Sequence, residues 1–221
     1  PEISKICEGA FLDCKNLTKI EIPQNSNLQE IDKYAFSGSE IKEIFIPSNI
    51  SKISENAFSN CEILTKVEIP TNSKLQTLEK RVFSNSNINE IFIPSTVSKI
   101  GEGAFSYCSE LDKVVIPAKI ELQIIESGTF VRSKIKEIFI PPSVLKICES
   151  AFLNCTNLTK IEIPKNSNLQ IIERSAFEWT SIEEIYFPNS LNELKEGWCH
   201  NTQNLKKITI SPSNDQFIFK D

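Results

Sequence analysis

Cysteine and histidine are the residues with the widest chemical scope in this chain, which holds seven cysteines and one histidine. Cys199 and His200 are neighbours in sequence, and a thiol beside an imidazole is the pairing that a cysteine nucleophile requires. A structural zinc site needs four Cys or His ligands at short spacings, and no C-x-x-C motif is present. We interpret Cys199 as a buried thiol in an atypical last repeat, and we predict neither a catalytic residue nor a metal site.

The composition argues against several further classes of function. Six glycines leave little material for a phosphate-binding loop, and the carboxylates form no pair in an apolar context that would raise a pKa. The formal net charge of −5 has the wrong sign for a nucleic-acid partner. No apolar run approaches the roughly 18 residues of a membrane span. We therefore predict a chain that is not an enzyme and that uses no cofactor and no small-molecule substrate.

A repeat of 23 or 24 residues organises the whole chain, and the two spacings alternate so strictly that the true period is 47 residues. Each unit contains L-x-x-I-x-I-P, in which the alternation of β-branched residues predicts a short strand that the proline ends. Units of this size cannot bury an apolar face alone, so they must stack as a solenoid. The prolines are Pro23, Pro47, Pro70, Pro94, Pro117, Pro141, Pro164 and Pro188, with Ser211 in the ninth place.

A phenylalanine recurs once in each unit, usually after an alanine, and predicts a stacked aromatic spine inside the solenoid. These residues are Phe11, Phe36, Phe58, Phe83, Phe105, Phe130, Phe152 and Phe177, with Cys199 in the ninth place. The polypeptide opposite the strands is expected to form turns or short helical segments.

Four cysteines share one position, three residues after the phenylalanine: Cys14, Cys61, Cys108 and Cys155. They alternate with Ser39, Ser86, Ser133 and Thr180. This exchange favours small buried groups that donate weakly to a backbone carbonyl. Disulfides Cys7–Cys14 and Cys148–Cys155 are conceivable, but the sister repeats carry Ser54 and Gly101, so we expect the fold not to require them.

Two outward-facing columns flank the central Ile of each strand. The first alternates in sign at every position and predicts a ladder of opposite charges that fixes the register of the strands. It consists of Lys19, Glu43, Lys66, Glu90, Lys113, Glu137, Lys160, Glu184 and Lys207.

The second column places an aromatic ring on every second strand. It consists of Glu21, Phe45, Glu68, Phe92, Val115, Phe139, Glu162, Tyr186 and Thr209. Solvent-facing rings in a regular stripe are typical anchors of protein interfaces. The alternative is structural, because each ring can cover the aliphatic stems of neighbouring Lys and Glu.

The pattern L-x-x-I-x-x-x-A-F-x-x-C-x-x-L-x-x-I-x-I-P resembles the BspA-like leucine-rich repeats of surface proteins from anaerobic bacteria and mucosal protozoan parasites. The resemblance covers essentially all 221 residues. It implies an α/β leucine-rich-repeat solenoid, with nine short parallel strands on one face and turns or short helices on the other. We predict a single domain over residues 1–221. The absence of Met and the ending SPSNDQFIFKD, which looks like the start of a further unit, predict a fragment of a longer chain.

The resemblance also implies a non-enzymatic, cell-surface or secreted adhesin that binds a host-cell or matrix protein through its concave sheet. The candidate contact residues are the rings Phe45, Phe92, Phe139 and Tyr186 and the charges Glu21, Glu68, Glu162, Lys66, Lys113 and Lys160. A spacer without a ligand and an intracellular scaffold are the alternatives. The unpaired thiols favour the scaffold, whereas the resemblance favours the surface.

Overall fold

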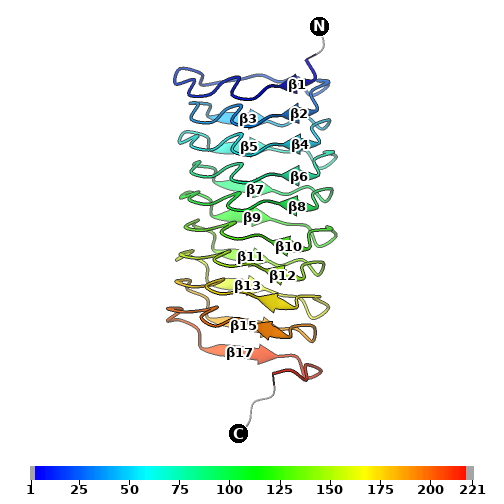
Figure 1. The fold of residues 1–221 in the computed structure, drawn as a ribbon, viewed down its shortest axis with the longest axis vertical. Helices are drawn as coiled ribbons and strands as arrows, with labels where there is room; N and C mark the ends of the chain where they lie inside the picture. The colour runs from blue at the N-terminus through cyan, green and yellow to red at the C-terminus, as the bar shows by residue number, and fades with distance from the viewer. Residues whose placement is uncertain (1–2, 218–221) are drawn as a thin grey trace.

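The computed structural model describes residues 3–217, and in it the repeats form a column of stacked turns (Figure 1). The first turn contains β1 (Lys5–Ile6), and the last contains β17 (Lys207–Ile210) at the opposite end of the column. Residues 218–221, at the end of the predicted further unit, lie outside the described residues. Successive turns contact one another along two walls of parallel strands and a third wall of turns.

The predicted I-x-I strands form one eight-stranded parallel sheet in which neighbouring strands come from consecutive units. Except in β17, at the end of the column, the central residue of each strand points into the core, as the buried Cα partners Ile91 and Val114 illustrate; the equivalent Ile208 of β17 is exposed. The prediction of nine strands is wrong by one: residues 19–21, at the open end of the column, form no strand, and Ile20 is only half-buried. With β17, the strands are β3 (Glu43–Phe45), β5 (Lys66–Glu68), β7 (Glu90–Phe92), β9 (Lys113–Val115), β11 (Glu137–Phe139), β13 (Lys160–Glu162) and β15 (Glu184–Phe187).

Two-residue strands build the second wall, for which turns or short helices were predicted. No helix occurs in residues 3–217, so the α/β class and the short helices are wrong. One sheet contains β1, β2 (Glu30–Ile31), β4 (Lys52–Ile53), β6 (Thr77–Leu78) and β8 (Lys99–Ile100). The other contains β10 (Ile124–Ile125), β12 (Lys146–Ile147), β14 (Ile171–Ile172) and β16 (Glu193–Leu194).

Left-handed backbone explains why the A-F segments do not become helices. Asn56 and Asn60 flank one such segment with φ values of 56° and 57°, and equivalent pairs recur along the column. A residue with positive φ cannot continue a right-handed helix. The main-chain groups bond between units instead: the N–H of Phe58 donates to the carbonyl oxygen of Val82 at 2.9 Å. We call this side of the column, which carries the A-F segments, the turn wall.

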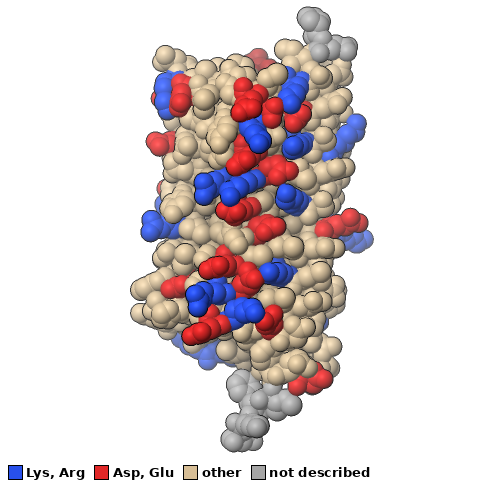
Figure 2. All heavy atoms as spheres, in the orientation of Figure 1, with Lys and Arg blue, Asp and Glu red and all other residues tan. Residues whose placement is uncertain are grey.

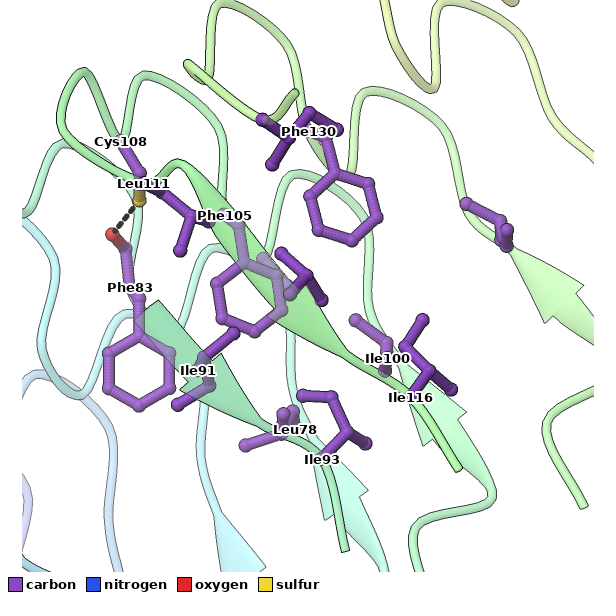
Figure 3. Packing of buried hydrophobic residues seen from close by; sticks show 14 of the residues in the cluster. Leu78, Phe83, Ile91, Ile93, Ile100, Phe105, Cys108, Leu111, Ile116 and Phe130 are labelled. Atoms are coloured by element: carbon purple, nitrogen blue, oxygen red, sulfur yellow. Dashed lines mark hydrogen bonds between the residues drawn. The ribbon is translucent and has the colours of Figure 1, made fainter. Parts of the chain in front are cut away.

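The predicted phenylalanine spine is confirmed. Consecutive rings from Phe11 to Phe177 stack with centroids 5.0 to 5.7 Å apart and planes within 12° of parallel. Phe11, at the open end, is half-buried, whereas the other seven rings are fully buried. Trp198 ends the stack: its ring meets Phe177 edge-on at 6.2 Å. Ile91, Ile93, Ile100 and Ile116 pack beside the spine (Figure 3).

The cysteine column is buried and bonded as predicted, except at its first member. Cys61, Cys108 and Cys155 are fully buried, and Cys14 is half-buried. The Cys108 thiol donates to the carbonyl oxygen of Phe83 at 3.1 Å (Figure 3). All seven cysteines are free, and Cys199 is half-buried rather than buried.

The second wall is interrupted once, between β8 and β10. Within the described chain no main-chain hydrogen bond joins these strands, although all other neighbouring strands of this wall are paired. Gly101, just after β8, lies unusually close to the preceding unit: an added Cβ would lie 2.6 Å from the nitrogen of Lys80. The missing side chain lets this unit approach its predecessor closely.

Candidate protein-binding face

The charge ladder runs along the exposed face of the eight-stranded sheet (Figure 2). Lys113 has Glu90 and Glu137 as its Cα partners on the two adjacent strands, as the alternating pattern predicts. Among the described ladder residues, three lysines pair with the glutamate of the preceding unit: Lys113–Glu90 at 3.4 Å, Lys160–Glu137 at 3.8 Å and Lys207–Glu184 at 3.7 Å. All these side chains are exposed, so each pair adds little stability.

The other candidate charges lie on the same surface but pair within their own strand. Lys66 contacts Glu68 at 3.2 Å, and Lys160 lies 4.0 Å from Glu162. Glu21 lies outside the sheet, in the half-exposed first unit, and contacts Lys19 at 2.6 Å. This hydrogen bond lowers the pKa of the Glu21 carboxyl.

The aromatic column is in register, but its rings are less exposed than predicted. Phe45, Phe92, Phe139 and Tyr186 are all half-buried, because part of each ring lies against the sheet. Their partners on the next strand have short or flexible side chains, as in the pairs Phe45 with Glu68 and Tyr186 with Thr209. Each ring therefore remains partly accessible to solvent.

Shallow hollows lie beside two of these rings. One, of about 360 Å³, is lined by Phe45 with Glu21 and Glu68 from the units on either side. The other, of about 240 Å³, is lined by Phe139 with Val115 and Glu162. The two hollows occupy equivalent places in the repeat, and both have a lysine and glutamate rim.

Val115 is an exposed apolar residue of this face that was not among the candidate contact residues from the sequence. Its repeat equivalents Glu68 and Glu162 are acidic, whereas Val115 is an exposed aliphatic side chain, with 39% of its surface accessible. Its strand, β9, lies between β7 and β11, so Val115 connects Phe92 and Phe139 in one apolar patch. The departure from the repeat pattern at position 115 was the available signal.

Other chemistry is sparse in the described part of the chain. No group of three or more Cys, His, Asp or Glu residues is placed to hold a metal ion in residues 3–217. His200 lies 3.6 Å from Glu178, and burial raises the pKa of the neighbouring Cys199 thiol. Among the described residues no helix has the length and apolarity to cross a membrane.

The stacked units and their parallel sheet define the chain as a leucine-rich-repeat solenoid. The family described as "BspA type Leucine rich repeat region (6 copies)" matches residues 1–112 and 100–219. The chain therefore belongs to the BspA-type leucine-rich-repeat family. Comparison with curated protein sequences gives no significant match.

Several solved structures share the fold. A leucine-rich repeat protein from Bacteroides ovatus is 26% identical with a TM-score of 0.79, over 94% of this chain and 59% of that one. The pneumococcal vaccine antigen PcpA is 23% identical with a TM-score of 0.58, over 96% of this chain and 60% of that one. A leucine-rich repeat protein of T. pallidum is 22% identical, with a TM-score of 0.59 and 73% of each chain covered. The chain thus spans about three fifths of the length of the first two.

Proposed function

We propose that this chain is a non-enzymatic protein-binding module of a cell-surface or secreted protein, an adhesin that engages a host-cell or matrix protein. The observation that carries the proposal is the apolar patch of Phe92, Val115 and Phe139 on the exposed face of a rigid sheet. Apolar and aromatic side chains in a hollow with a charged rim are typical anchors of protein interfaces. The BspA-like resemblance supports the surface location.

The ladder gives this face its electrostatic character. Lys and Glu alternate along the sheet, so the surface has little net potential and suits a protein better than a polyanion. Its charges would orient a partner, while the rings and Val115 would supply most of the binding energy. A spacer role is the second candidate, favoured by the straight column of stacked turns in Figure 1.

Binding to host epithelial cells and to a panel of extracellular-matrix proteins tests the proposal. We expect saturable binding that is lost when Phe45, Phe92, Phe139 and Tyr186 are all replaced by Ala. The matched control replaces Tyr34 and Trp179 by Ala, because these rings are also exposed but lie on the turn wall. Binding that survives the sheet-face variant would overturn the assignment of this face, and absence of binding by the parent chain would favour the spacer.

A single substitution gives a finer test of the patch. Val115→Glu restores the residue found at the equivalent positions 68 and 162, so the fold should tolerate it. We expect about tenfold weaker binding, because a carboxylate replaces the apolar centre of the patch. The reciprocal control, Glu162→Val, should leave binding intact or improve it.

A further inference from the structure

A second charge ladder runs along the turn wall, at the residue that precedes the first left-handed position of each A-F segment. It consists of Glu8, Lys33, Glu55, Lys80, Glu102, Ser127, Glu149, Arg174 and Glu196. Carboxylate and cation alternate at every position except one. Ser127 occupies a position at which the alternation predicts a cation, so it departs from the pattern of the repeat.

The bonded pairs show which carboxylate this gap affects. Lys33 contacts Glu55 at 3.9 Å, and Lys80 contacts Glu102 at 2.9 Å. In both pairs the cation reaches the glutamate of the following unit. A cation at position 127 would therefore pair with Glu149, which has no Lys or Arg within 4.0 Å in residues 3–217.

A hollow of about 770 Å³ lies over this gap. Ser127 is followed by Gly128, and the preceding unit has Gly103 at the same place, so neither glycine projects a side chain into the space, although the stem of Arg81 lies beside Gly103. Glu102 and Glu149 lie on its rim. The missing positive charge and the unfilled space thus lie at the same unit of the column.

The remaining lining suits an elongated cation. Tyr107, 49% exposed, contributes an aromatic ring, and this ring already accepts the Arg132 guanidinium at 5.5 Å from its centroid. Arg81 also lines the hollow, but it belongs to the unit that lies two strand spacings, about 9.6 Å, before Ser127. Glu102 already pairs with Lys80 at 2.9 Å, so Glu149 is the carboxylate of the hollow that is left without a cation in the described part of the chain.

We propose that the turn-wall hollow binds a Lys or Arg side chain presented by a partner protein. The inserted cation would occupy the vacant place of the ladder, between Glu102 and Glu149, with its aliphatic stem over Ser127 and Gly128. Charge complementarity with Glu149, the carboxylate that lacks a cation of the ladder, selects the occupant. The site is independent of the sheet face, so a partner can engage the column on two sides.

Titration with Nα-acetyl-lysine methylamide, followed by the backbone amide resonances of Gly103, Ser127 and Gly128, tests this site directly. We expect saturable shifts in the millimolar range at these amides. The arginine analogue should act in the same way, and the uncharged norleucine analogue should cause no shift. No saturable shift with either cation, or shifts of the same size at Gly197 beside Glu196, would overturn the proposal.

Ser127→Lys supplies the decisive variant, because it completes the ladder with the chain's own side chain. We expect it to abolish the shifts at Gly103 and Gly128 and to raise the melting temperature slightly at low salt. Ser95→Lys is the matched control, since it adds the same charge at an exposed position outside the hollow and should leave the titration unchanged. Shifts that persist undiminished in Ser127→Lys would contradict the site. Loss of matrix binding by the sheet-face variant has no bearing on this result.

Discussion

The thiol of Cys108 donates a hydrogen bond to the main-chain carbonyl oxygen of Phe83, 3.1 Å away in the preceding unit. The hydroxyl of Ser86 donates to the same oxygen at 2.7 Å. One carbonyl therefore joins a thiol and a hydroxyl from adjacent units. Cys61 and Cys155 repeat the thiol contact with Phe36 and Phe130. The strict 47-residue period thus has a physical counterpart, because the carbonyls of Phe36, Phe83 and Phe130, which lie 47 residues apart, each accept a thiol from the following unit.

Replacement of Cys108 by Ala should destabilise the fold, whereas replacement by Ser should cost less. The Ala variant loses the bond to the Phe83 carbonyl and leaves a small void, for a cost of about 1–2 kcal/mol. Ser keeps a donor, and Thr202 already donates to the equivalent carbonyl of Phe177 at 2.9 Å. Urea denaturation measures both variants. An Ala variant as stable as the Ser variant would show that the thiol bond has no net value.

Alkaline pH should weaken the fold through the same column. Burial raises the pKa of Cys61 and Cys108 to about 11 and that of Cys155 to about 12, whereas the thiols of the unfolded chain ionise near 9. Above pH 9 the unfolded chain releases protons first, so the free energy of unfolding falls by about 1 kcal/mol per pH unit for each thiol. This loss should continue up to the folded pKa values.

The control for the alkaline loss is a variant in which Cys61, Cys108 and Cys155 are all Ser. Unfolding curves from pH 8 to pH 11 should be less steep in their pH dependence for this variant than for the parent chain. Lysine titration is common to both proteins and cancels in the comparison. Identical pH dependence would contradict the assignment of the loss to the buried thiols.

Replacement of a spine phenylalanine by Ala should lower the free energy of unfolding more in the middle of the column than at its open end. Phe105 is fully buried between Phe83 and Phe130, so Phe105→Ala should lose about 3–5 kcal/mol. Phe11 is half-buried and stacks on Phe36 alone among the described rings, so Phe11→Ala should lose markedly less. Chemical denaturation compares them, and equal losses would be the contrary result.

Ser54 is the site of a stabilising substitution. Its hydroxyl is buried and has no hydrogen-bond partner among the described residues. Cys7 and Cys148 occupy the equivalent place, so Ser54→Cys should fit and raise the free energy of unfolding by about 1 kcal/mol. Cys148→Ser is the reciprocal variant and should lose stability. Thermal unfolding of both decides the matter, and a loss in Ser54→Cys would indicate that the hydroxyl is satisfied in solution.

Periodicity in the sequence is sufficient to predict the repeat, the spine and the alternating ladder. Each depends on one residue type that recurs at one position, as Phe58 and Lys113 do. The two-residue strands of the second wall were missed because a pair such as Lys52–Ile53 is too short to show an alternation.

For the turn wall, turns or short helical segments were predicted, and the helical alternative is wrong for a different reason. Asn60 and Gly103, whose residue types often adopt a positive φ, occupy two of its left-handed positions. Tyr107 and Trp179 occupy two others, and their residue types do not predict a positive φ. Val115 and Ser127, in contrast, were visible as departures from a pattern. What the sequence could not supply was the hollow beside each of them, because a hollow depends on the spacing of three units rather than on one residue.

The interruption between β8 and β10 has a consequence for cooperativity. In a stacked array each unit is stabilised by its two neighbours, so the array unfolds most readily at the weakest interface. Two contacts join the units at this interface: the pairing of β9 with β11 and the stacking of Phe105 on Phe130. Within the described chain the second wall contributes no main-chain hydrogen bond there. We expect the column to behave as two foldons that share one seam, with amide exchange starting at the β8 and β10 edges.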